Sequence, residues 1–242
     1  MRHYYSYRCA SGEDPRLLAL PSSLLENADV LDVGCHEALL SLSLARFFHP
    51  RHVHGVDIDP SLVKRAVRNM ASLVRHHGKH IFNQTQFTFA SIDFTSRLDQ
   101  QQQHHNHQHH RLCHKHSYDT LLMMSVLKWV QLNGGDAALH RCLCNAWHVL
   151  RPGGSLVLEI QPLKSYRKAL KKHRLPQDMR ENFSSISIVP NNLVEYATQS
   201  IGFEYAHILR SASNSGFDRD IVALRKPYGT DDTDNQNRIH DT

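Results

Sequence analysis

Three strand-end positions in the first hundred residues combine a glycine turn with acidic side chains at a spacing suited to a nucleoside. Gly34 follows the apolar segment 29–33, where a residue without a Cβ lets the backbone approach a ligand closely. Asp57 comes about twenty positions later, where a carboxylate can accept hydrogen bonds from both ribose hydroxyls. Asp93 and Phe94 end the next segment and offer a polar group and an aromatic face to an adenine. Taken alone, Asp57 or Asp93 is better explained as a turn residue at a strand end, but together with Gly34 they predict a cofactor site.

The type of cofactor follows from the composition of the glycine turn. The pattern GxGxxG is absent from the sequence, so no backbone nest for a pyrophosphate is expected. S-adenosyl-L-methionine has a ribose, an adenine and an amino acid but no phosphate, and it therefore fits better than a nicotinamide dinucleotide. The sequence predicts a methyltransferase.

These residues need a parallel sheet to bring the strand ends to one edge. Short apolar runs typical of strands alternate with helical patterns along the chain. We expect strands at 29–33, 53–58, 87–92, 118–124 and 155–160, and helices at 39–48, 61–75 and 136–150. The segment Arg151-Pro152-Gly153-Gly154 is expected to stop the last helix and turn into the last strand. The fold class predicted is α/β, a doubly wound, mostly parallel, Rossmann-like sheet.

Composition limits the function classes. The chain has 242 residues and a mass of 27.8 kDa, with 40% hydrophobic and 21% charged residues, which excludes wholesale disorder and a coiled coil. It has no apolar run of the roughly 18–20 residues that span a bilayer, and its start lacks the apolar core of a signal peptide. Five cysteines without a CxxC pair argue against disulfides or a zinc site. A net charge of +5 favours an anionic partner.

Low-complexity sequence marks two segments outside the predicted core. Residues 100–116 are rich in Gln and His and are expected to form a mobile insertion. Histidines without fixed geometry bind metals only opportunistically, so no metal is predicted. Residues 228–242 are polar and are expected to be a disordered tail. The remainder, 1–227, is expected to be a single domain.

A set of motifs resembles one enzyme family over roughly residues 2–227, apart from the insertion. The motifs, in chain order, are Tyr4-Tyr5-Ser6-Tyr7-Arg8, Glu13-Asp14-Pro15-Arg16-Leu17, 30–35, Asp57-Ile58-Asp59, 125–133, 150–154 and Glu159-Ile160-Gln161-Pro162. They resemble the RNA methylphosphate capping enzymes, the bicoid-interacting type of RNA 5′-γ-phosphate methyltransferases. The resemblance implies a class I methyltransferase that methylates the terminal γ-phosphate of a small nuclear RNA, in the nucleus or otherwise in the cytoplasm.

The resemblance also implies cofactor-binding residues. They are Tyr5, Arg16, Gly34, Cys35, His36, Asp57, Ile58, Asp93, Phe94 and Met124. The first loop departs from the family pattern, because His36 stands where Asn is usual and Ala38 where a second glycine is usual.

The RNA side of the site is expected to be basic. A terminal phosphate is mostly dianionic at pH 7, so it needs orientation rather than a general base. We expect Lys128, Arg8, Tyr4 and Tyr7 around the reacting phosphates. Trp129 would stack on a base or else belong to the core. Further RNA contacts are expected from Phe217 and from a basic cluster whose alternative interpretation is a solvated helix face. The cluster comprises Lys164, Arg167, Lys168, Lys171, Lys172 and Arg174.

Two other functions remain open. His36 and Ala38 favour an RNA-binding subunit of a ribonucleoprotein that keeps the fold and has weak or no catalysis. A second branch of the same family methylates RNA 5′-monophosphates, and the sequence does not distinguish the two kinds of RNA end.

Overall fold

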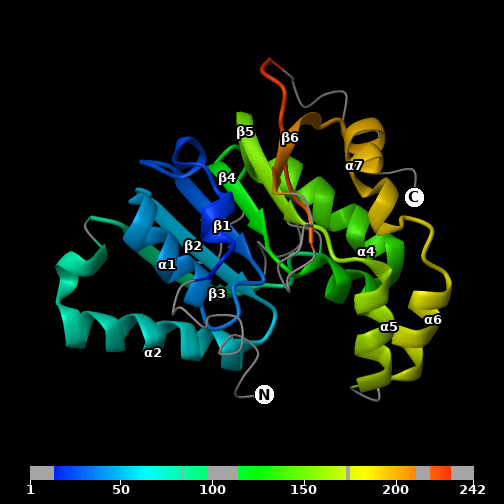
Figure 1. Cartoon of the computed structure of the whole chain (residues 1–242), viewed down its shortest axis with the longest axis horizontal. Helices are drawn as coiled ribbons and strands as arrows, with labels where there is room; N and C mark the ends of the chain where they lie inside the picture. The colour runs from blue at the N-terminus through cyan, green and yellow to red at the C-terminus, as the bar shows by residue number, and fades with distance from the viewer. Residues whose placement is uncertain (1–13, 83, 97–113, 173–174, 211–218, 230–242) are drawn as a thin grey trace. The chain divides into compact units, whose positions relative to one another are not determined.

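The computed structural model describes residues 14–82, 84–96, 114–172, 175–210 and 219–229 (Figure 1). Backbone contacts group the chain into two compact units, Met1–Ile92 and Asp93–Thr242. The predictions for residues 100–113 and 230–242 lie outside the described residues. So do those for Tyr4, Tyr5, Tyr7, Arg8, Arg174 and Phe217.

The first unit contains three parallel strands in the order β3-β2-β1. Their bounds are β1 (Asp29–Val33), β2 (His52–Asp57) and β3 (Gln86–Ser91). Strand β1 matches its predicted range, whereas β2 and β3 each begin and end one residue earlier than predicted. All five residues of β1 are buried, as expected for a parallel strand covered on both faces.

Two α-helices follow β1 and β2, as the sequence predicts. They are α1 (Leu39–Phe48) and α2 (Pro60–His77), with the short 3₁₀ helices η1 (Leu17–Ala19), η2 (Ser22–Leu24) and η3 (Lys79–Phe82). The Asp59 carboxylate caps α2 by accepting a 2.8 Å hydrogen bond from the Ser61 N–H. Leu42, Ala66 and Phe82 share one apolar cluster, so α1, α2 and η3 pack together.

The second unit has a mixed sheet in the order β4-β5-β7-β6. Strands β4 (Tyr118–Met123) and β5 (Leu150–Glu159) are parallel, and β7 (Ile221–Arg225) is antiparallel to both β5 and β6 (Glu204–Arg210). The predicted helix stop before residue 151 is confirmed, because α4 (Leu127–Val149) ends there, but the predicted turn at residues 151–154 is wrong, because β5 already begins at Leu150. Gly153 N–H donates to the Lys226 carbonyl, and Lys226 N–H donates to the Gly154 carbonyl, so pairing with the distant end of β7 extends the strand.

Helix α4 (Leu127–Val149) also starts earlier than the predicted Asp136. Gly134 and Gly135 are non-helical, with φ of −141° and +64°, and they divide the helix into two segments. The predicted helix is therefore the second segment, and the first one carries Lys128 and Trp129.

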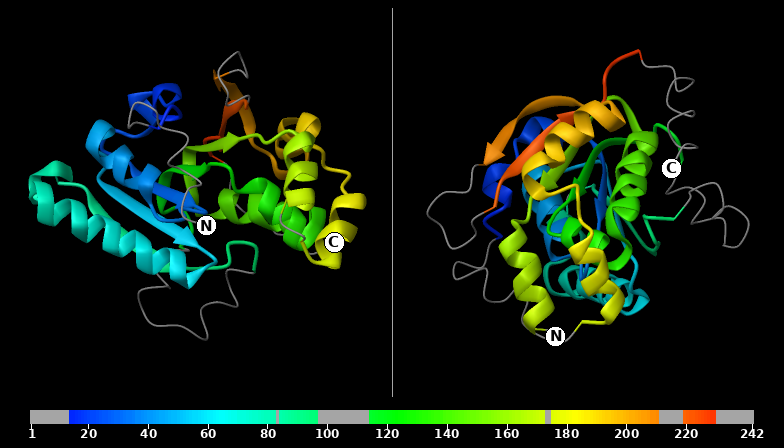
Figure 2. Two further views of the ribbon diagram at one scale, coloured as in Figure 1. Left: turned by 60° about the horizontal axis from the view of Figure 1, so that its bottom comes forward. Right: turned by 90° about the vertical axis from the view of Figure 1, so that its right-hand side faces the viewer.

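Two further helices pack against that first segment. They are α5 (Leu163–Lys172) and α6 (Gln177–Ser184), which Figure 2 shows in two views. Leu132, Tyr166 and Leu170 form the buried cluster between them. The chain continues through η5 (Pro190–Asn192), α7 (Leu193–Tyr196) and η6 (Ala197–Ile201).

Residues 114–116, the end of the predicted insertion, are tied to this unit. The His116 N–H donates to the His148 carbonyl at 3.2 Å, and its Nδ1 lies 3.1 Å from the Leu150 carbonyl oxygen. Among the described residues, no helix is long and apolar enough to cross a bilayer, and no three His, Cys, Asp or Glu side chains are placed to hold a metal.

Candidate active site

The loop after β1 is fastened to the end of β2. The N–H groups of Gly34 and Cys35 both donate to the Val56 carbonyl, at 2.8 and 3.0 Å. The His36 N–H donates to Asp57 Oδ2 at 2.9 Å. Gly34 has a φ of +75°, a backbone conformation that favours glycine. The structure thus brings together four of the predicted cofactor residues within the first unit.

Asp57 holds two backbone segments at once. Its Oδ2 accepts from His36 N–H, and its Oδ1 accepts from the Asp59 N–H at 3.0 Å. A carboxylate has about four lone-pair sites, so two remain for ribose hydroxyls. The neighbouring Ile58 is 68% exposed, which is unusual for isoleucine and leaves an apolar surface for a ligand beside the carboxylate.

The backbone conformation at His36 and Ala38 shows how the loop accommodates these two departures from the family pattern. Both have a positive φ, +55° and +60°, in the left-handed region that Asn and Gly adopt most readily. The loop therefore keeps the backbone conformation for which the usual residues are suited, although each substituted residue carries strain of about 1–2 kcal/mol.

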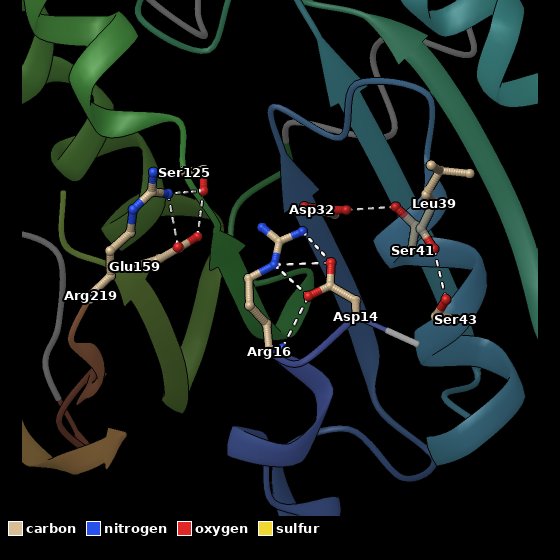
Figure 3. A network of polar contacts seen from close by, with 9 residues as sticks. All are labelled: Asp14, Arg16, Asp32, Leu39, Ser41, Ser43, Ser125, Glu159 and Arg219. Atoms are coloured by element: carbon tan, nitrogen blue, oxygen red, sulfur yellow. Dashed lines mark hydrogen bonds and ion pairs between the residues drawn. The ribbon is translucent and has the colours of Figure 1, made fainter. Parts of the chain in front are cut away.

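Asp32 is a buried carboxyl, two residues before Gly34, to which the sequence analysis gave no role. It lies in β1, is 2% exposed, and accepts a 2.5 Å hydrogen bond from Ser41 Oγ (Figure 3). Burial raises the pKa of Asp32 to about 6, against the lowering effects of Ser41 and of the Arg16 charge, and the nearby Asp57 charge raises it further. The sequence signal was an acidic residue between Leu31 and Val33, in the apolar part of β1.

Asp32 and Asp57 place two carboxyl groups near the strand ends of the first unit. This arrangement suits the cationic sulfonium and ammonium groups of S-adenosyl-L-methionine, and it would repel the pyrophosphate of a dinucleotide. Asp57 would hold the ribose, and Gly34 would let the backbone approach it.

Arg16 lies beside Asp32 but is paired elsewhere. Its Nε donates to Asp14 Oδ1 at 2.9 Å, its Nη2 also donates to Asp14, and the arginine is only 2% exposed (Figure 3). The structure therefore shows a charge pair that fixes this part of the chain, while the predicted contact of Arg16 with the cofactor stays a prediction.

Asp32 gives a pH-dependent prediction. Its folded-state pKa of about 6 exceeds the ordinary 3.8, so the stability that its protonated form contributes is fully present below pH 3.8 and is lost as the pH rises through about 6. The difference corresponds to about 3 kcal/mol. Asp32→Asn cannot ionise, and its stability relative to the wild type should rise by about 2–3 kcal/mol between pH 4 and pH 8, measured by denaturant unfolding without cofactor.

Asp59 provides a control of opposite sign. Hydrogen bonds from Ser61 lower the pKa of this exposed carboxyl, so its contribution is present above the unfolded value and disappears in acid. Asp59→Asn should therefore lose stability relative to the wild type as the pH rises. A pH-independent gap between Asp32→Asn and the wild type would contradict the burial argument.

In the second unit, the predicted cofactor residues Asp93, Phe94 and Met124 lie within three residues after the end of a strand. Asp93 Oδ1 accepts from Thr95 N–H at 2.9 Å and from Thr95 Oγ1 at 2.7 Å, which closes a turn. Phe94 and Met124 are buried, 5% and 3% exposed. Their contacts with the cofactor stay predictions, as does that of Cys35, whose thiol pKa is raised by burial.

Lys128 and Trp129 begin the first segment of α4. Lys128 is 5% exposed, its N–H donates to Gln161 Oε1 at 3.2 Å, and its Nζ lies 4.8 Å from the Trp129 ring centroid. Trp129 packs on the apolar cluster around Leu132 and Tyr166, so it has a core role. Stacking of the indole on an RNA base stays a prediction.

A polar triad that the sequence analysis did not find joins three strand ends. Ser125 Oγ donates to Glu159 Oε2 at 2.5 Å, and Arg219 Nη1 lies 2.9 Å from Glu159 Oε1 and 2.7 Å from Ser125 Oγ (Figure 3). Glu159 is fully buried. Its position at the end of the apolar run 155–158 was the available signal, but its partners are distant in sequence.

Helix α5 is amphipathic. Tyr166, Ala169 and Leu170 are buried, and the opposite face exposes five cations. These line an open concavity of about 550 Å³ and are called the α5 basic surface: Lys164, Arg167, Lys168, Lys171 and Lys172. The structure thus gathers all the described members of the predicted RNA-binding cluster on one helix.

Known proteins share this architecture. A SAM-dependent methyltransferase from Methanosarcina mazei matches with a TM-score of 0.54 at 18% identity, over 85% of this chain and 95% of the other. Residues 31–156 match the family described as "Methyltransferase domain". The protein is an S-adenosyl-L-methionine-dependent methyltransferase with the Rossmann-like class I fold, which confirms the fold and cofactor predictions.

The second half of the chain narrows the class. Residues 118–226 match the family described as "Bicoid-interacting protein 3 (Bin3)". The chain is 32% identical to a "Probable RNA methyltransferase" of Arabidopsis thaliana, over 93% of this chain and 79% of the relative. It is 27% identical to the "U6 snRNA methylphosphate capping enzyme Amus" of Drosophila melanogaster, over 93% and 73%. The chain belongs to the Bin3 family of RNA methyltransferases, as its motifs predict.

Proposed function

We propose that this enzyme transfers the methyl group of S-adenosyl-L-methionine to the 5′-terminal γ-phosphate of a small non-coding RNA, acting in the nucleus. Its Drosophila relative is named as a U6 snRNA capping enzyme, which supports this class of substrate. The observation that carries the proposal is the α5 basic surface, because five cations on one face suit an extended polyanion.

The location of the α5 basic surface supports the same conclusion. Helix α5 begins at Leu163, four residues after the end of β5 at Glu159, at the sheet edge where ligands of this fold class bind. An RNA whose 5′ end reaches that edge can therefore lay its following phosphates along α5.

The reaction needs little acid–base chemistry. A terminal phosphate with its second pKa near 6 is mostly dianionic at neutral pH, so its oxygen is already a nucleophile. S-adenosyl-L-methionine supplies an electrophilic methyl group when bound. Asp57 would fix the ribose, and Lys128 would hold the phosphate in line and balance its charge.

The proposal is tested with labelled cofactor and one transcript prepared with a triphosphate, diphosphate or monophosphate end. Label transfer to the triphosphate RNA is expected. Transfer to the monophosphate RNA alone would instead indicate the other branch of the family. RNA binding without measurable cofactor binding or label transfer would indicate a non-catalytic subunit.

The α5 basic surface should act through uniform binding. Replacing Lys171 and Lys172 with Ala should raise the KM for RNA and leave kcat near that of the wild type, because these cations contact phosphates away from the reacting group. The slope of log K against log salt should become shallower by about 1.4–1.8, since two fewer counterions are displaced.

A matched variant controls for net charge. Lys64 and Arg68 are exposed cations on α2 in the first unit, so Lys64→Ala/Arg68→Ala removes the same charge and leaves the α5 basic surface intact. The Lys64→Ala/Arg68→Ala variant should keep the KM for RNA and the salt slope near those of the wild type. Equal effects of the two double variants would mean that overall charge, and not the α5 basic surface, attracts RNA.

A further inference from the structure

Arg219 lies at the same sheet edge as the ends of β4 and β5. Strand β7 is antiparallel to β5, with Ile221 opposite Glu159, so the residue two positions before Ile221 lies at the carboxyl end of the parallel strands. The guanidinium joins the triad with Glu159 and Ser125 there. Arg219 thus lies at the same sheet edge of the second unit as the start of α4, which carries Lys128.

The triad fixes one side of the Arg219 fork. Both of its hydrogen bonds use Nη1, and among the described residues Nε and Nη2 make none. The Arg219 side chain is 14% exposed, so it is not fully enclosed by the described residues. A guanidinium held on one side presents a planar pair of donors on the other, a geometry that matches two phosphate oxygens.

The cost of building the triad indicates a role beyond stability. Glu159 is fully buried and Arg219 largely so, and a buried ion pair is often no more stabilising than apolar residues of the same size. Ser125, at the centre of the triad, has a φ of +66°, a strained conformation for a residue with a side chain. Such strain persists where a precise arrangement is enforced, and here the arrangement directly precedes the segment that carries Lys128.

We propose that Arg219 contacts the 5′-terminal phosphates of the RNA through Nε and Nη2, and that Glu159 is the positioning residue that holds it. The inference rests on the proposed function, whose substrate it describes in more detail. Glu159 neutralises Arg219 overall, so the contribution is orientation of the phosphate rather than general attraction of RNA.

Arg219→Lys separates this role from a structural one. Lysine keeps a cation for Glu159 but lacks the planar fork. The variant should keep the melting temperature and the cofactor affinity of the wild type, and its kcat with triphosphate RNA should fall by roughly a hundredfold, as for loss of one preorganised donor. Near-normal turnover in a folded Arg219→Lys variant would overturn the inference.

Glu159→Gln tests the positioning step. The amide can still bond to Ser125, but it no longer neutralises Arg219, so kcat should fall while the KM for RNA stays the same or decreases. A raised KM with unchanged kcat would contradict this role. If wild-type protein methylates no 5′-phosphate end in the same assay, the proposed function fails; if it does and both variants match it, only the Arg219 inference fails.

Discussion

Replacing Asp57 with Ala is expected to weaken S-adenosyl-L-methionine binding by two to four orders of magnitude. A hydrogen bond to a charged acceptor contributes about 1.5–3 kcal/mol, and two ribose bonds would be lost. The same carboxylate also accepts the backbone N–H groups of His36 and Asp59, so its removal releases the loop that carries Gly34. Titration calorimetry measures the affinity, and circular dichroism checks that the variant is folded.

Asp59→Ala is the matched control for Asp57→Ala. It removes a carboxylate two residues away that caps α2, which costs about 1 kcal/mol of stability but no proposed ligand contact. Its cofactor affinity should stay near wild type. An unchanged dissociation constant for Asp57→Ala, or equal losses in both variants, would remove Asp57 from the site.

Local signals predicted the cofactor end of the first unit. The apolar residues of β1 indicate a buried strand, and Asp59 followed by Pro60 indicates the start of α2. Gly34 indicates the turn after β1, because glycine readily adopts the positive φ found there. The positions of His36 and Asp57 follow from those elements. A parallel sheet brings the carboxyl ends of β1 and β2 together, and the hydrogen bond from His36 N–H to Asp57 joins them directly.

The features that the sequence did not predict depend on contacts between residues far apart in the chain. Pro152, Gly153 and Gly154 have the composition of a turn, and only pairing with Lys226 makes their segment a strand. Glu159 binds Arg219, 60 residues away, so a single sequence shows an isolated acidic residue where the fold has a triad. The raised pKa of Asp32 likewise reflects a balance between its burial and the charges of Arg16 and Asp57, which lie on other segments of the chain.

Replacing Lys128 is expected to lower turnover at saturating RNA by roughly 10²–10³-fold, the effect of removing one preorganised charge at a reacting group. Lys128→Met is the variant of choice because the ammonium is removed while an apolar stem still fills the buried position next to Trp129. Steady-state methylation of a triphosphate transcript, with the melting temperature as a check of folding, gives kcat and KM separately.

The split between kcat and KM distinguishes Lys128 from the α5 basic surface. An interaction that strengthens as the methyl group is transferred lowers kcat, whereas one that is equal in the bound and transition states changes only KM. Lys128→Met should therefore lose turnover with an unchanged salt slope, and the Lys171→Ala/Lys172→Ala variant should show the reverse. If Lys128→Met raised only the KM, the Lys128 ammonium would be one more RNA-binding cation. Arg219 would then have to orient the reacting phosphate without help from Lys128.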